Sequence, residues 1–67
     1  MNNLKGYRGK YGITQEQLAE QLGIRANAYA QKENGQREWK LGEIKVIVDF
    51  FKRFEPRVTV EQIFFNE

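Results

Sequence analysis

The spacing of Thr14, Ala19 and Gly23 constrains the fold of this chain more than any other feature. Thr14 can cap a helix that begins after it, and Gln17, three residues later, completes a capping box. A glycine directly after the periodic residues is where helices often end, in the left-handed conformation. The small side chain of Ala19 allows a following helix to cross closely. The spacing therefore predicts two short helices joined by a tight turn, over residues 14–22 and 25–33, with Tyr29 in the core.

Apolar residues at helical spacing predict three further helices. The first, over residues 2–11, needs packing to hold it, because Gly6 and Gly9 each cost about 1 kcal/mol relative to alanine in a helix. The last begins at Thr59, which forms a second capping box with Gln62. Residues 58–60 alternate like a strand, but so short a strand without a partner makes no sheet. We therefore expect an all-α fold of five short helices, with an exposed loop over residues 34–40 pinned by Trp39.

The fourth expected helix, over residues 41–53, carries two apolar lines. The first is the expected buried face, which consists of Leu41, Ile44, Ile47, Val48 and Phe51. The second consists of Val46, Phe50 and Phe54, and the long connection that follows would let the helix continue and project Phe54 outward. Exposed apolar lines on small proteins mark contacts with other chains, so we expect an association surface here. The alternative is that Phe50 and Phe54 fold back over the last helix.

Composition excludes several classes of function. The 67 residues suffice for one domain, over residues 1–67. The chain has no cysteine and no histidine, so it lacks disulfides, thiolate zinc sites and the commonest general base. We expect no enzyme, no metal, no cofactor and no small-molecule ligand. No apolar run is longer than three residues, as at Val46–Val48, which is far too short to span a bilayer, and the first residues lack the core of a signal peptide. We therefore expect a cytoplasmic protein with no membrane contact.

Charge is distributed unevenly along the chain. Residues 1–40 hold seven basic and four acidic side chains, whereas residues 41–67 hold four basic and five acidic ones. A basic part beside a neutral, aromatic part fits a face that binds a polyanion and a separate face that packs or binds a partner. A solvated surface with chance asymmetry is an equally good explanation of the charges alone.

The motifs of the central segment carry a family resemblance. They are Gly12-Ile-Thr-Gln15, Gln17-Leu-Ala-Glu-Gln-Leu-Gly-Ile24, Tyr29, Lys32-Glu-Asn-Gly35 and Arg37-Glu-Trp39. With them, the chain resembles the Cro and phage-repressor type of helix-turn-helix proteins, the XRE family, over about residues 3–51 and again over 58–64. The resemblance implies a lambda-repressor-like domain with its helix-turn-helix at about residues 14–34. It is closest to the small phage regulators of that family.

The resemblance also implies roles for individual residues. The base-contacting positions are Arg25, Ala26, Asn27 and Gln31; the backbone-contacting positions are Gln15, Asn34 and Arg37; and Arg8 with Glu33 forms a structural salt bridge. The chemistry agrees, because arginine can bind guanine, and asparagine or glutamine can bind adenine, through two hydrogen bonds. Each polar residue has a plainer alternative as a solvated helix residue. Ala26, Ala28 and Ala30 leave the expected reading face poor in polar groups.

Two functions from different classes fit these features. The first is a sequence-specific, homodimeric transcriptional repressor of phage type, which binds double-stranded DNA in a bacterial host cell. The alternative is a protein-interaction modulator or antirepressor that keeps the fold, binds a larger phage repressor protein and has weak DNA binding of its own. The alanine-rich reading helix and the extra apolar line favour this alternative. A third possibility is a domain detached from a longer regulator.

Overall fold

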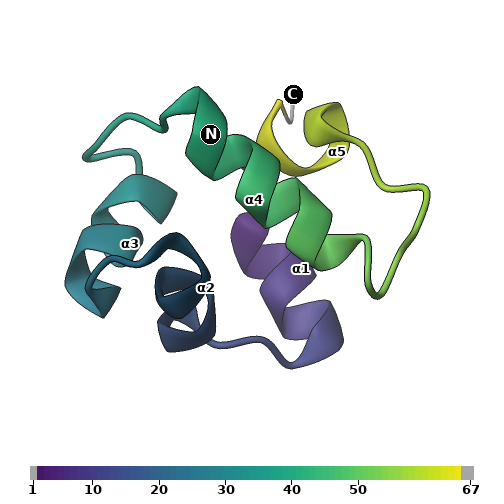
Figure 1. The fold of residues 1–67 in the computed structure, drawn as a ribbon, viewed down its shortest axis with the longest axis horizontal. Coiled ribbons are helices and arrows are strands. Elements are labelled where there is room, and N and C mark those ends of the chain that lie inside the picture. Colours follow the sequence, from purple (N-terminus) through teal and green to yellow (C-terminus); the bar gives the residue numbers. More distant parts are fainter. Residues whose placement is uncertain (1, 66–67) are drawn as a thin grey trace.

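The computed structural model describes residues 2–65, and this part of the chain consists of five helices without a strand (Figure 1). The helices are α1 (Leu4–Tyr11), α2 (Gln15–Leu22), α3 (Ala26–Glu33), α4 (Leu41–Phe51) and α5 (Val60–Phe64). The expected all-α fold is confirmed. The domain expected over residues 1–67 also includes Met1, Asn66 and Glu67, which lie outside the described residues.

Both predicted capping boxes are present. The Thr14 hydroxyl accepts a hydrogen bond from the Gln17 N–H at 3.1 Å, and the Gln17 side chain accepts one from the Thr14 N–H at 2.7 Å. Thr59 and Gln62 repeat the arrangement at 3.2 and 2.9 Å. At the other end of α2, Gly23 has φ of 69°, a conformation that costs glycine little because it has no Cβ. Local chemistry thus sets the limits of α2 and the start of α5.

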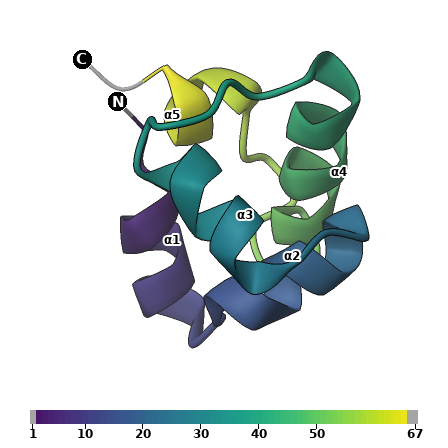
Figure 2. The same cartoon turned by 90° about the vertical axis from the view of Figure 1, so that its left-hand side faces the viewer.

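The core lies between the helices, where α4 packs against α2 and α5 (Figures 1 and 2). It comprises Leu4, Ile13, Leu18, Ala19, Tyr29, Ile47, Val48, Phe50, Phe51, Val58, Ile63 and Phe64. Trp39 joins α3 to α5, because its ring lies edge-on to Tyr29 at 5.8 Å and to Phe64 at 5.1 Å between centroids. This contact pins the loop after α3, as the sequence predicts.

Leu41 does not belong to the buried face of α4, contrary to expectation. It is 83% exposed, whereas Ile47 and Phe51 on the same predicted face are fully buried. Leu41 is the first residue of α4, and the chain begins this helix before it reaches the core. Periodicity identifies the face of a helix but does not show how far along that face a neighbour extends.

The expected association surface is also wrong at Phe50, which is 8% exposed and part of the core. Its ring packs edge-on to Phe51 at 5.6 Å, and the Arg53 guanidinium lies over it at 5.2 Å. Val46 and Phe54 remain exposed, at 38% and 43%. The second apolar line is therefore interrupted at its centre and does not form a continuous surface.

The reason lies in the turn that follows α4, which ends at Phe51 rather than at residue 53. The N–H groups of Phe54 and Glu55 both donate to the Phe51 carbonyl, at 2.9 Å each, and reverse the chain. Phe54 stacks on Tyr11 of α1 at 5.0 Å, and Glu55 accepts hydrogen bonds from Tyr11 and Lys10. These hydrogen bonds hold the pKa of Glu55 below its usual value. Phe54 thus folds back on α1 instead of projecting outward.

Candidate nucleic-acid interface

The outward face of α3 is the candidate reading surface. Residues four and three apart on a helix share a face, so Asn27, Gln31 and Asn34 lie on the side opposite the buried Tyr29 and Lys32. Asn27 and Asn34 are exposed and Gln31 is partly exposed. The Asn27 side-chain oxygen accepts a hydrogen bond from the Ala28 N–H at 3.0 Å, which leaves its amide donors directed at solvent. The face offers amide groups of the kind that read adenine.

Two other expected base-contacting residues, Arg25 and Ala26, lie at the start of α3 and outside this outward face. Arg25 precedes the first turn of α3 in an extended conformation, is exposed, and forms no ion pair within residues 2–65. Ala26 is partly buried and packs against the core. The structure therefore places Arg25 at the free N-terminal end of α3, and turns Ala26 partly away from solvent.

A single carboxylate, that of Glu33, joins α1, α2 and α3. Arg8 donates two hydrogen bonds to it from Nε and Nη2, each 2.8 Å long, so the expected salt bridge is present. Gln15 donates a third at 3.1 Å, and the Tyr29 hydroxyl donates a fourth at 2.9 Å. The Glu33 side chain is only 5% exposed. We call Glu33 with its donors Arg8, Gln15 and Tyr29 the Glu33 cluster.

The electrostatics of the Glu33 cluster favour the ion pair. Burial acts to raise the pKa of the Glu33 carboxyl, but hydrogen bonds from Arg8, Tyr29 and Gln15 outweigh it and hold the pKa below its usual value. The same hydrogen bond to Glu33 raises the pKa of Arg8. Burial, and then the charge of Glu33, raise the pKa of Tyr29, so its hydroxyl stays protonated and can donate.

This lowered pKa predicts that stability falls in acid. The folded-state pKa of Glu33 lies below its unfolded value of about 4.3, so the carboxylate contributes stability above that value, which is lost as pH falls through the folded-state pKa. Urea unfolding at a series of pH values from about 7 to about 3 measures the effect. The free energy of unfolding of the Glu33→Gln variant is expected to depend less steeply on pH than that of the wild type. The Glu16→Gln variant changes an exposed acid outside the cluster and should keep the wild-type slope. A wild-type slope in Glu33→Gln would contradict the assignment.

The expected backbone-contacting residues gather near the C-terminal end of α3. Gln15 is brought there from α2 by its hydrogen bond to Glu33, while Asn34 ends α3 and Arg37 follows in the loop. Asn34 and Arg37 are exposed. The structure thus places Gln15 beside the C-terminal end of α3, and separates it from Arg25 by the length of that helix. Their contacts with DNA remain predictions.

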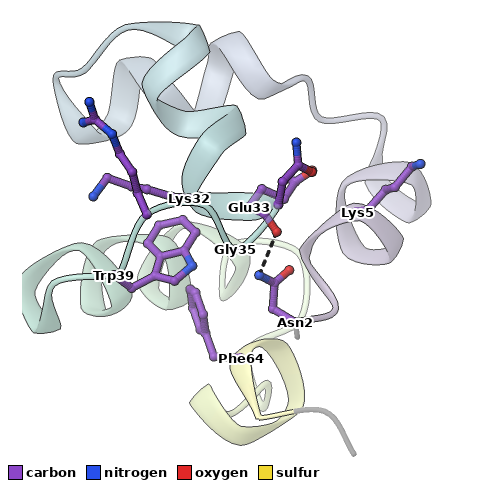
Figure 3. Close-up of a pocket in the computed structure, with 9 residues that line it drawn as sticks. Asn2, Lys5, Lys32, Glu33, Gly35, Trp39 and Phe64 are labelled. Atoms are coloured by element: carbon purple, nitrogen blue, oxygen red, sulfur yellow. Dashed lines mark hydrogen bonds between the residues drawn. The ribbon is translucent and has the colours of Figure 1, made fainter.

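Lys32 and Trp39 hold the loop after α3 from its core-facing side. The Lys32 ammonium, on a buried side chain, donates to the Glu38 carbonyl at 3.1 Å and pairs with Glu43 of α4 at 3.0 Å. Figure 3 shows Trp39 beside Phe64, in a pocket of about 540 Å³. The indole N–H has no hydrogen-bond partner within residues 2–65, so packing holds the ring. The loop that carries Arg37 is therefore anchored at Glu38 and Trp39, directly after Arg37.

Lys32, Tyr29 and Asn2 support this interface, a role that the sequence patterns do not predict for them. Lys32 lies three residues after Tyr29, so it shares the core-facing side, and this spacing is a usable signal for a buried, paired lysine. Tyr29 was expected only as a core residue. Asn2 donates to the Glu33 backbone carbonyl at 3.2 Å, a contact with no local signal (Figure 3).

Comparison with known proteins identifies one family. A family model described as Helix-turn-helix, HTH_3, matches residues 4–53, which is most of the chain. No curated protein and no solved structure matches the chain. Among the helices of residues 2–65, none has both the length and the apolar character needed to cross a membrane.

Proposed function

The chain belongs to the Cro/repressor type of helix-turn-helix family, whose members are DNA-binding regulators, and from this premise we propose that it is a sequence-specific transcriptional repressor of phage type. In this proposal α3 enters the major groove of double-stranded DNA, in the cytoplasm of a bacterial host cell. The protein acts as a homodimer, because one domain of this size makes few base contacts. Catalysis has no part in the proposed function.

The observation that carries the proposal is the outward face of α3, together with its support. Asn27 and Gln31 present amide groups from a helix whose opposite side carries the buried Tyr29 and Lys32. The Glu33 cluster holds the C-terminal end of that helix against α1 and α2. A helix held in this way has its backbone in place before DNA binds, which lowers the ordering cost of binding.

We assign two kinds of contact within this interface. Arg25, Asn27 and Gln31 would contact base edges, where arginine suits guanine and the amides suit adenine; Ala26 would contribute at most an apolar contact with a thymine methyl group. Gln15, Asn34 and Arg37 would contact phosphate oxygens, which position the protein without reading sequence. The side-chain amide of Gln15 donates one of its two hydrogens to Glu33, so the second is available to donate to a phosphate.

The alternative is a modulator that binds a larger phage repressor protein. The alanines on either side of the outward face of α3 favour it. Ala28 and Ala30 border Asn27 and Gln31 and offer no hydrogen bond to a base. Weak binding to every duplex, with tight binding to another repressor, would support this alternative over the main proposal.

Paired substitutions test the two kinds of contact. On a duplex selected from a random pool, Asn27→Ala is expected to cost about 1–3 kcal/mol and to relax the preference at one base position. Arg37→Ala is expected to weaken selected and random duplexes equally, and to lower the salt slope of log K by about 1. Fluorescence anisotropy at several salt concentrations measures both effects.

Arg57→Ala serves as the control, because Arg57 is an exposed cation in the connection to α5. It should bind both duplexes nearly as the wild type does. Identical patterns for Asn27→Ala and Arg37→Ala would show that the division into reading and backbone residues is wrong. A wild-type protein that binds no duplex at low salt would contradict the proposed function itself.

A further inference from the structure

An apolar groove runs between α4 and the start of α5, away from the candidate reading surface. Its floor is formed by Ile44 and Val48 of α4 and by Val58 and Val60, and its volume is about 800 Å³. Leu41 stands at one end of it and is 83% exposed. Burying this exposed leucine and the apolar groove beside it against a partner chain would be favourable, because it removes apolar surface from water.

The rim of the groove carries equal numbers of opposite charges. Lys45 and Lys52 are basic, Asp49 and Glu61 are acidic, and all four are exposed. None of them forms an ion pair within residues 2–65, although Lys45 and Asp49 are one helical turn apart. Lys45 and Asp49 lie four residues apart on α4, so each meets its opposite charge when a second copy is related by a two-fold rotation and the two helices run antiparallel. A strongly charged partner of one sign would leave half of the rim opposed to like charge.

We propose that this groove binds a second copy of the same chain in a two-fold symmetric dimer. The two α4 helices lie antiparallel, with Lys45 of one copy opposite Asp49 of the other, and each Leu41 packs against the groove of its neighbour. Antiparallel pairing about a point between residues 45 and 49 brings these two positions together twice, because the interface is isologous.

The position of the groove is compatible with DNA binding. In Figure 1, α3 lies at the left end of the long axis, and α4 with the connection to α5 fills the centre and the right. A second copy on the α4 side therefore leaves both α3 helices uncovered. The longest extent of the domain is 28 Å, so two copies side by side carry their α3 helices apart by a distance of the order of one DNA turn, about 34 Å. This argument rests on the proposed function, whereas association through the groove does not.

The first experiment measures the solution mass of the whole chain without DNA, by analytical ultracentrifugation over a range of concentrations. The wild type is expected to be a dimer that dissociates on dilution. Leu41→Asp removes two buried leucines per dimer and is expected to weaken association at least a hundredfold, with an unchanged circular dichroism spectrum. Val46→Asp is the matched control, since Val46 is exposed on the same helix but does not line the groove; it should dimerise normally.

The second experiment tests the register by exchanging charges. Lys45→Glu alone and Asp49→Lys alone each place like charges together twice per dimer, and each is expected to weaken association about tenfold or more. Mixing the two variants restores both attractive pairs and should yield a heterodimer near wild-type affinity. A wild type that is monomeric at every concentration, a dimeric Leu41→Asp variant, or a mixture that does not associate would each overturn the proposal. Because no DNA is present, these outcomes test the dimer alone and leave DNA binding by α3 to be judged separately.

Discussion

Replacing Glu33 with alanine is expected to lower the free energy of unfolding by about 3–5 kcal/mol. The substitution leaves Arg8 without its ion-pair partner, and its side chain is 15% exposed. It also removes the acceptor of Gln15 and of the buried Tyr29 hydroxyl. A donor left buried without an acceptor loses its hydration without compensation. A domain of this size has about 3–10 kcal/mol of stability in total, so the variant should be close to unfolding.

Urea denaturation followed by circular dichroism measures this loss. Glu38→Ala is the matched control, because the Glu38 side chain is exposed in the nearby loop, and its carbonyl, which Lys32 uses, is retained. The control is expected to lie within about 0.5 kcal/mol of the wild type. Equal stability of Glu33→Ala and Glu38→Ala would mean that the Glu33 cluster does not hold the three helices together.

Replacing Phe50 with glutamate is expected to unfold the domain. Truncating a buried phenylalanine alone costs about 3–5 kcal/mol, and a carboxylate at an apolar site adds a desolvation cost. The Phe50 ring is 8% exposed and in contact with Phe51 and Phe54. The far-ultraviolet circular dichroism of the purified variant, compared with the wild type at the same temperature, reports the loss of helix.

Phe54→Glu is the companion variant, because Phe54 is 43% exposed and packs mainly on Tyr11 and Phe50. It is expected to remain folded and to lose about 1–2 kcal/mol from the stacked aromatic contact and its buried area. A Phe50→Glu variant that stayed folded and lost only its association with another chain would restore the continuous apolar line as an interface, and would contradict the core position of Phe50.

At the candidate site, the sequence predicts some of the residues and contacts but not all of them. The base-contacting roles of Asn27 and Gln31 follow from the family resemblance, and the structure has both residues on one outward face. The Arg8–Glu33 pair also follows from the resemblance. The hydrogen bonds of Gln15 and Tyr29 to the same carboxylate do not, because they depend on how α2 and α3 cross.

The sequence by itself determined the local structure of this protein. The capping boxes at Thr14 and Thr59 and the glycine stop at Gly23 depend on groups within a few residues of one another, so local chemistry suffices to predict them. The periodic pattern likewise determined that all five elements are helices. These interactions join groups that lie close together in the chain, so the sequence shows them without the tertiary structure.

Only the tertiary structure decided which apolar side chains are covered. Leu41, Val46, Phe50 and Phe54 have the same hydrophobic character in the sequence, yet Phe50 is buried and Leu41 is almost fully exposed. The difference arises because the turn after α4 folds Phe54 onto Tyr11 and closes the region around Phe50, while no element of residues 2–65 covers Leu41 at the start of α4. Whether a side chain is buried depends on the neighbours that the whole fold brings to it, so the periodicity of one helix does not predict it.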